Sequence, residues 1–147
     1  QFDHRIDGYL AAIERYRLPC GSDLLFDGKP PYHTEIAEGY ALAQELLKSE
    51  RRFTAVICLN DLMAMGAISA FQEAGLRVPE DVSVMGFDDI LFSQAWRPSI
   101  TTMAVSKAEF GKKAFELLYT NIQQGTTGYY LNQLELIQRA STASPCR

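Results

Sequence analysis

Four polar side chains stand at corresponding places in two neighbouring parts of the sequence. Asn60 and Asp61 follow one short apolar run, and Asp88 and Asp89 follow another. A carboxylate accepts hydrogen bonds from two hydroxyl groups, and an amide both donates and accepts them, so this set suits a small polar molecule. Structural roles remain open as well, because Asp88 can cap a turn and either Asn60 or Asp61 can cap a helix. On an extended backbone Asp89 points away from Asp88, so we expect it to be structural or to lie at the rim of the site.

Two strands and a helix must position these side chains. Residues 53–59 form a short apolar run with β-branched residues, which is typical of a strand buried on both faces. The helical pattern that starts at residue 61 ends at Gly75, and residues 82–87 form the second apolar run. A strand, a helix and a strand in this order predict a parallel pair, and ligands bind at the carboxyl edge of such sheets.

The rest of the chain continues the alternation of helices and strands. The patterns predict helices over 4–17, after a cap at Thr34 and over 107–124, and further strands over 24–26, 101–105 and 131–139. This order predicts an α/β fold with a Rossmann-like, mainly parallel sheet flanked by helices. Because a right-handed crossover needs a strand before its helix, we expect one more strand to precede the first helix in the natural protein.

The composition is that of an ordinary soluble domain. Of 147 residues, 47% are hydrophobic and 22% are charged, and the net charge is −4. The basic residues are scattered, whereas a nucleic-acid surface needs them clustered, and no apolar run reaches the roughly 18 residues of a membrane span. The three cysteines, Cys20, Cys58 and Cys146, have unrelated spacings, which predicts reduced, mainly structural thiols in a cytoplasmic protein.

Enzyme-like interpretations find little support in the residues. The glycine motifs of dinucleotide sites and phosphate-binding loops are absent, and the two histidines, His4 and His33, lie far apart. We therefore expect neither a cofactor nor a metal ion. A phosphoacceptor site built on Asp88 and Asp89 would also require a lysine at a later strand end, which the predicted elements do not supply. We do not expect an enzyme.

The segment 58–89, CLNDLMAMGAISAFQEAGLRVPEDVSVMGFDD, resembles the signature of the LacI/GalR family of transcriptional regulators. Three further segments are similar to parts of that family: RIDGYLAAI at 5–13, RPSITTM at 97–103 and RAST at 139–142. One departure is Ile100, which stands where leucine is usual. The resemblance implies the second subdomain of a periplasmic-binding-protein-like type I fold.

The resemblance also implies how the chain is divided. Residues 1–105 and 126–147 would form the second subdomain, and residues 106–125 would cross back to the first, which lies outside this sequence. The helix predicted for 107–124 carries apolar residues over half its circumference or more, wider than the stripe of a surface helix. We therefore expect this helix to need partners on more than one side and the chain alone to be an incomplete folding unit.

The resemblance also implies functions for individual residues. It implies that Arg5, Asn60 and Asp88 bind a small-molecule effector, a sugar or sugar derivative, while Asp61 caps the helix that follows. In the family an aromatic or apolar side chain against the sugar ring often comes from a loop that here reads FDGKPPYHTE, at 26–35, longer and richer in proline than usual. The candidates for this contact are Phe26, Tyr32 and His33.

Partners are implied in the same way. A regulator of this family is a repressor-like homodimer that binds operator DNA through a helix-turn-helix headpiece, which is not in this sequence. The predicted dimer interface consists of Met65, which falls outside the apolar arc of its helix, and of Ala95 and Trp96 in an irregular loop. The alternative with the same fold is a periplasmic sugar-binding protein of a transporter. The combination of LRVPEDVSV with GFDD favours the regulator.

Overall fold

The structure, a computed structural model, describes residues 3–18, 24–26, 33–49 and 51–144 and divides into two units. The first unit, residues 1–32, contains helix α1 (Asp3–Tyr16), which confirms the helix predicted for 4–17. Residues 24–26 do not form the predicted strand, because a strand requires a hydrogen-bonded neighbour and this short apolar segment pairs with none of the described strands.

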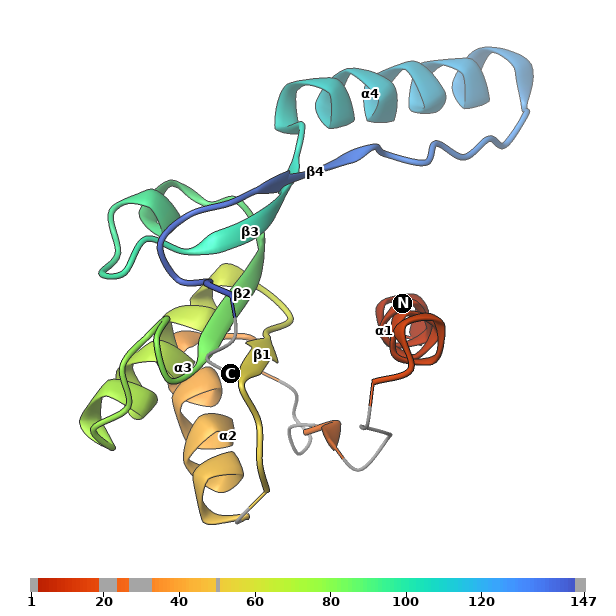
Figure 1. Cartoon of the computed structure of the whole chain (residues 1–147). Coiled ribbons are helices and arrows are strands. Elements are labelled where there is room, and N and C mark those ends of the chain that lie inside the picture. Colours follow the sequence, from red (N-terminus) through yellow and green to blue (C-terminus); the bar gives the residue numbers. More distant parts are fainter. Residues whose placement is uncertain (1–2, 19–23, 27–32, 50, 145–147) are drawn as a thin grey trace. The chain divides into compact units, whose positions relative to one another are not determined.

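The second unit, residues 33–147, is built around a four-stranded sheet (Figure 1). The strands follow one another in the sheet in chain order: β1 (Ala55–Ile57), β2 (Ser83–Asp88), β3 (Thr101–Val105) and β4 (Leu134–Ile137). The first three are parallel, and β4 is antiparallel to β3. The mainly parallel α/β sheet predicted from the sequence is therefore confirmed, and the carboxyl ends of β1, β2 and β3 meet at one edge.

Strand β1 is shorter and far less buried than the strand predicted for 53–59. It has three residues and pairs only with β2 among the described strands, so it forms an edge, and Ile57 is 65% exposed. Strand β2 lies between two others, and its Val84 is fully buried. The prediction of burial on both faces was wrong for β1, because neighbouring elements and not apolar composition decide what a strand buries.

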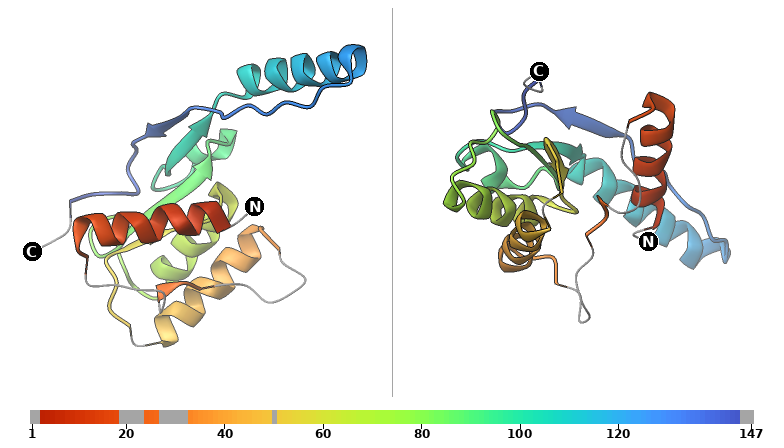
Figure 2. Two further views of the ribbon diagram at one scale, coloured as in Figure 1. Left: turned by 90° about the vertical axis from the view of Figure 1, so that its right-hand side faces the viewer. Right: turned by 60° about the horizontal axis from the view of Figure 1, so that its bottom comes forward.

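Helices α2 (Ile36–Lys48) and α3 (Asp61–Glu73) lie side by side (Figure 2). Two glycines permit the close approach, since a Cβ on Gly66 would lie 2.0 Å from the Ile36 carbonyl oxygen. A Cβ on Gly39 would lie 2.2 Å from the Met63 carbonyl oxygen. Helix α2 begins later than predicted, because Glu35 and not Thr34 occupies its N-cap position.

Helix α3 supplies much of the core of the second unit. Met65, expected on an exposed side of this helix, is only 1% exposed. Helix α3 packs against α2 and also against β2, so positions that a helical wheel leaves to solvent are covered. The expected exposure of Met65 is therefore wrong, whereas the dimer interface itself stays a prediction. On a helical wheel Ala74 shares an apolar arc with the other buried apolar residues of α3, but it is exposed just beyond the end of the helix. Those buried residues are Ala64, Ala67, Ile68, Ala70 and Phe71.

Helix α4 (Lys107–Gln124) has the predicted bounds but buries no residue. It begins at a cap by Ser106 and ends at Gly125, whose φ of +65° is left-handed. The segment that follows it runs back alongside the helix, and Tyr130 Oη donates to Glu109 at 2.7 Å (Figure 1). The exposed apolar face expected for this helix is confirmed, whereas the division of the chain at 105/106 and 125/126 stays a prediction. Its large exposed apolar residues are Phe110, Phe115, Leu118, Tyr119 and Ile122.

Candidate functional site

The carboxyl edge of the parallel strands brings together three polar residues that are far apart in sequence. Asn60 follows the end of β1, Asp88 is the last residue of β2, and Lys107 follows the end of β3. The register pairs Asp88 with Ala104, near the end of β3. The expectation that Asn60 and Asp88 share one edge of the sheet is confirmed, and Lys107 is an addition.

Asn60 caps helix α3, a role that the sequence analysis assigned to Asp61. Its Oδ1 accepts a hydrogen bond from the Met63 backbone N–H at 2.8 Å, and its Nδ2 donates to the Thr34 carbonyl oxygen at 2.9 Å. Such caps contribute about 1 kcal/mol to helix stability. The assignment of the cap to Asp61 was therefore wrong. Effector binding by Asn60 stays a prediction, and the same amide would serve both purposes.

Asp61 is instead a fully buried acceptor. Its Oδ1 accepts from Thr102 Oγ1 at 2.6 Å, and its Oδ2 accepts from Ser93 Oγ at 2.6 Å and from the Ile90 N–H at 2.9 Å. Gly86 makes room for this carboxylate, because a Cβ there would lie 2.2 Å from Asp61 Oδ1. A buried carboxylate is tolerated only with such bonds, so Asp61 ties the start of α3 to β3 and to the loop after β2.

The backbone at the end of β2 is not extended, contrary to the geometry assumed for the two aspartates. Asp88 has φ of +100° and Asp89 has φ of +47°, and residues other than glycine rarely adopt positive φ values. Asp89 Oδ1 forms an ion pair with Arg139 Nη2 at 2.7 Å, and Arg139 Nη1 donates to the Ile100 carbonyl oxygen at 2.9 Å. The structural role expected for Asp89 is confirmed. Strained backbone of this kind clusters at functional sites, which directs attention to Asp88.

The structure places a lysine, Lys107, just after the end of β3, where the sequence pattern alone did not place one convincingly. Its Nζ donates to the carbonyl oxygens of Asp89 at 2.7 Å and Asp88 at 3.1 Å. These partners are main-chain atoms, and the Asp89 carboxylate is paired with Arg139. The arrangement therefore differs from a phosphoacceptor site, in which the carboxylates themselves hold a metal ion. The sequence analysis did not identify Lys107 as a site residue, because it considered this residue only as the first residue of the helix predicted for 107–124.

The remaining candidates are distributed over both units. Arg5, an exposed residue of α1, and Phe26 belong to the first unit, and their position relative to this edge is not described. Tyr32 lies outside the described residues, as do Cys20 and Cys146. His33 is exposed and precedes Thr34, the residue whose carbonyl oxygen binds Asn60, so the main chain beside His33 reaches the edge.

Cys58 follows β1 near the same edge and is a protected thiol. Burial, followed by the nearby negative charge of Asp61, raises the pKa of the Cys58 thiol to about 12. The thiol is therefore protonated at neutral pH, which suits a structural role and not a reactive one. No group of three or more metal-binding side chains occurs among the residues that the structure describes.

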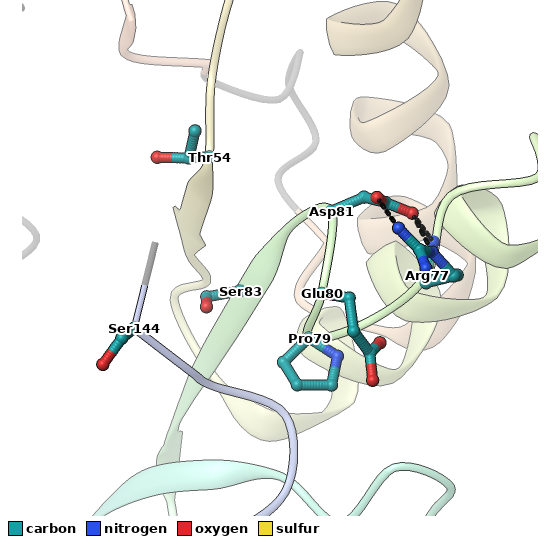
Figure 3. Close-up of a pocket in the computed structure, with 7 residues that line it drawn as sticks. All are labelled: Thr54, Arg77, Pro79, Glu80, Asp81, Ser83 and Ser144. Atoms are coloured by element: carbon teal, nitrogen blue, oxygen red, sulfur yellow. Dashed lines mark hydrogen bonds and ion pairs between the residues drawn. The ribbon is translucent and has the colours of Figure 1, made fainter. Parts of the chain in front are cut away.

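A pocket lies at the opposite edge of the sheet, where β2 begins (Figure 3). Two of its charged residues are paired, because Arg77 forms two side-chain hydrogen bonds with Asp81 at 2.6 and 2.8 Å. These bonds lower the pKa of Asp81 to about 2. Ser83 Oγ donates to the Ala143 carbonyl oxygen at 3.3 Å and accepts from the Ala143 N–H at 3.1 Å. Arg77, Asp81 and Ser83 thus serve the fold, and the carboxyl edge is the better candidate site.

Comparison with known proteins gives the relationship of the chain. The family model for the periplasmic binding protein-like domain matches residues 1–142. A similar curated protein is the HTH-type transcriptional repressor PurR of Mannheimia succiniciproducens, 42% identical over 118 residues, which are 80% of this chain and 34% of that protein. The chain thus spans about a third of the length of this relative.

Two solved structures extend the comparison. A LacI-type transcription regulator from Bifidobacterium animalis subsp. lactis superposes with a TM-score of 0.85 at 32% identity, covering 95% of this chain and 50% of that one. A LacI family regulator from Enterococcus faecium, solved with bound ribose, has a TM-score of 0.78 at 31% identity, covering 97% of this chain and 51% of that one. No helix among the described residues is long and apolar enough to cross a membrane. The chain belongs to the periplasmic-binding-protein-like domain family, in which it corresponds to the C-terminal part of the effector-binding region of LacI-type regulators.

Proposed function

We propose that this chain is the effector-binding and dimerisation region of a LacI/GalR-type regulator and that its effector is a sugar or sugar derivative. The observation that carries the proposal is Asp88, a half-buried carboxylate at the carboxyl end of β2 with φ of +100°. It shares the ligand edge of the sheet with Asn60, and a polyhydroxyl molecule offers the donors that a carboxylate accepts. In this proposal the chain catalyses no reaction.

Further contacts would come from one residue of the family motif and from the loop at 26–35. The guanidinium of Arg5 offers five donors for hydroxyl groups, and Phe26, Tyr32 or His33 would pack against the sugar ring. The ribose in the Enterococcus faecium relative supports a sugar. Because the amide of Asn60 also suits the ring nitrogens of a nucleobase, bases belong in any panel of candidate effectors.

The effector would act by shifting an equilibrium between two arrangements of the complete protein. The free energy by which the effector can shift this equilibrium is limited to the difference between its binding free energies for the two arrangements. The complete protein, a cytoplasmic regulator, would bind operator DNA through a helix-turn-helix headpiece. The name of the PurR relative and the regulator structures support this function over a sugar-binding protein of a transporter.

The loop between β2 and β3 is the proposed dimer interface. Ala95 is exposed and Trp96 is half-buried, and Leu91 and Phe92 in the same loop are 74% and 64% exposed. A group of exposed apolar side chains around a tryptophan is typical of an interface. We expect Phe92→Ser combined with Trp96→Ala to shift the complete protein toward monomer in sedimentation velocity, and an unaltered dimer would remove this loop from the interface.

Calorimetry on the complete natural protein tests the effector site. The panel comprises D-ribose, D-galactose, D-glucose, inorganic phosphate and adenine. A hydrogen bond to a charged group contributes about 1.5–3 kcal/mol, so Asp88→Ala should weaken binding of the best panel member roughly tenfold or more. Asp81→Ala, at the opposite edge of the sheet, is the matched control and should leave affinity unchanged. Equal affinity of the wild type and Asp88→Ala would remove Asp88 from the site.

A further inference from the structure

One side chain connects the first turn of α4 to the ligand edge of the sheet. Lys107 is the first residue of α4, and its Nζ donates to the carbonyl oxygens of Asp89 at 2.7 Å and Asp88 at 3.1 Å. Both oxygens belong to the positive-φ residues at the end of β2. A single ammonium group thus joins the end of β2, which carries the proposed effector ligand, to the beginning of α4.

The charge of Lys107 is not explained by the helix that it begins. The unsatisfied N–H groups of a helix N-terminus carry partial positive charge, so a cation in the first turn is unfavourable. Ser106 already caps α4, and Glu109 supplies the acidic residue that a first turn favours. The hydrogen bonds to the two carbonyl oxygens stabilise the ammonium group instead. The position of Lys107 is therefore explained by the end of β2 and not by the helix.

The turn that Lys107 contacts is tied on its other side to the core. The Asp89 carboxylate pairs with Arg139, and the Asp89 N–H donates to Thr102 Oγ1 at 3.4 Å. Thr102 in turn donates to the buried Asp61. A main-chain movement at Asp88 would therefore strain these bonds or be passed on through the two carbonyl oxygens to Lys107.

We propose that Lys107 is a positioning residue that transmits occupancy of the site at Asp88 to helix α4. The inference rests on the function proposed above. A molecule that draws the Asp88 carboxylate toward itself shifts the adjoining carbonyl oxygens and, with them, Lys107 and the first turn of α4. In this chain the residues of the first turn, 107–110, are exposed, so the described elements do not hold this turn by packing.

Amide hydrogen exchange of the complete natural protein, without any effector, tests the connection. Lys107→Met removes the donors and keeps most of the stem, and it should raise exchange at residues 88–90 and 106–110 about three- to tenfold. Lys112→Met is the control, because Lys112 is an exposed lysine of the same helix whose Nζ lies 3.9 Å from Glu116. Lys107→Arg keeps a charged donor for both oxygens and should restore slow exchange.

A double-mutant comparison separates transmission from a merely structural role. Asp88→Ala should change exchange at 106–110 when Lys107 is present and should have no further effect in the Lys107→Met background. Equal exchange in Lys107→Met and Lys112→Met would overturn the proposal. So would an effect of Asp88→Ala on α4 that is the same in both backgrounds.

Binding experiments distinguish this inference from the proposed function. D-ribose and adenine serve as probes, and operator affinity is measured with and without them. If neither binds the wild-type protein, the proposed function is contradicted for both ligand classes, while the exchange result still decides the role of Lys107. If a probe binds and changes operator affinity equally in the wild type and Lys107→Met, the transmission by Lys107 is overturned.

Discussion

Helices α3 and α4 begin in the same way, but α3 is largely buried and α4 is exposed. Each follows a parallel strand and each has a side-chain cap, Asn60 for α3 and Ser106 for α4. Helix α3 buries eight of its 13 residues, whereas α4 buries none of its 18. The difference shows that the signals that start a helix are independent of the contacts that enclose it.

The two helices are also held by different kinds of interaction. Helix α3 rests on close packing at Gly66 and on the buried carboxylate of Asp61. Helix α4 relies on local pairs, of which Lys113 and Glu116 at 2.8 Å form one. Hydrogen bonding to Lys113 lowers the pKa of the Glu116 carboxyl, but exposed pairs of this kind contribute little to stability. Substitutions should therefore have large effects in α3 and small ones in α4.

The largest effect is expected from Asp61→Ala. This change leaves the hydroxyls of Ser93 and Thr102 without their buried acceptor and opens a cavity, so it should lower the free energy of unfolding by about 3–5 kcal/mol. Urea unfolding followed by circular dichroism measures it. Asp61→Asn keeps the volume and one acceptor oxygen and should cost clearly less. Equal losses for the two variants would contradict the role of the carboxylate.

A smaller loss is expected from Gly66→Ala. The new Cβ would lie 2.0 Å from the Ile36 carbonyl oxygen and 2.6 Å from the Tyr40 backbone nitrogen, both main-chain atoms that move only with α2. Overpacking of this kind costs about 1–3 kcal/mol. The urea midpoint should fall accordingly, and a midpoint that rises would show that α2 and α3 are less closely packed than described.

The same substitution in α4 should have the opposite sign. A Cβ on Gly111 meets nothing within 4 Å, so Gly111→Ala gains helix propensity without a clash. The gain should be about 0.5–1 kcal/mol, visible as slower amide exchange across α4 in the isolated chain. Faster exchange would mean that this face of α4 is already covered.

The smallest effect on stability is expected from Phe115→Gln in the isolated chain. The ring is 67% exposed, so its removal should change the free energy of unfolding by less than about 0.5 kcal/mol. The same change should reduce the fluorescence of a hydrophobic dye, which we expect to bind the open face of α4. A loss above about 1 kcal/mol would show that Phe115 is enclosed.

Local patterns determined most of the elements of this fold. The strand predicted for 101–105 and the helix predicted for 107–124 match the structure, and Gly125 ends that helix with the left-handed φ expected of a terminal glycine. The parallel pairing of β1 with β2, and hence the shared edge of Asn60 and Asp88, also followed from the order of the elements. The bounds of the elements depend on residues within a few positions of one another, and the parallel pairing follows from their order along the chain, which is why the sequence contains both.

Only the tertiary structure decided which neighbours each side chain meets. Asp61 became the buried acceptor and Asn60 the cap because Ser93 and Thr102, 32 and 41 residues away from Asp61, come to lie beside the carboxylate. Met65 became buried because α3 packs against both α2 and β2, which a helical wheel of one helix does not represent. Contacts between distant segments depend on how whole elements pack, and the periodicity of a single segment does not predict them.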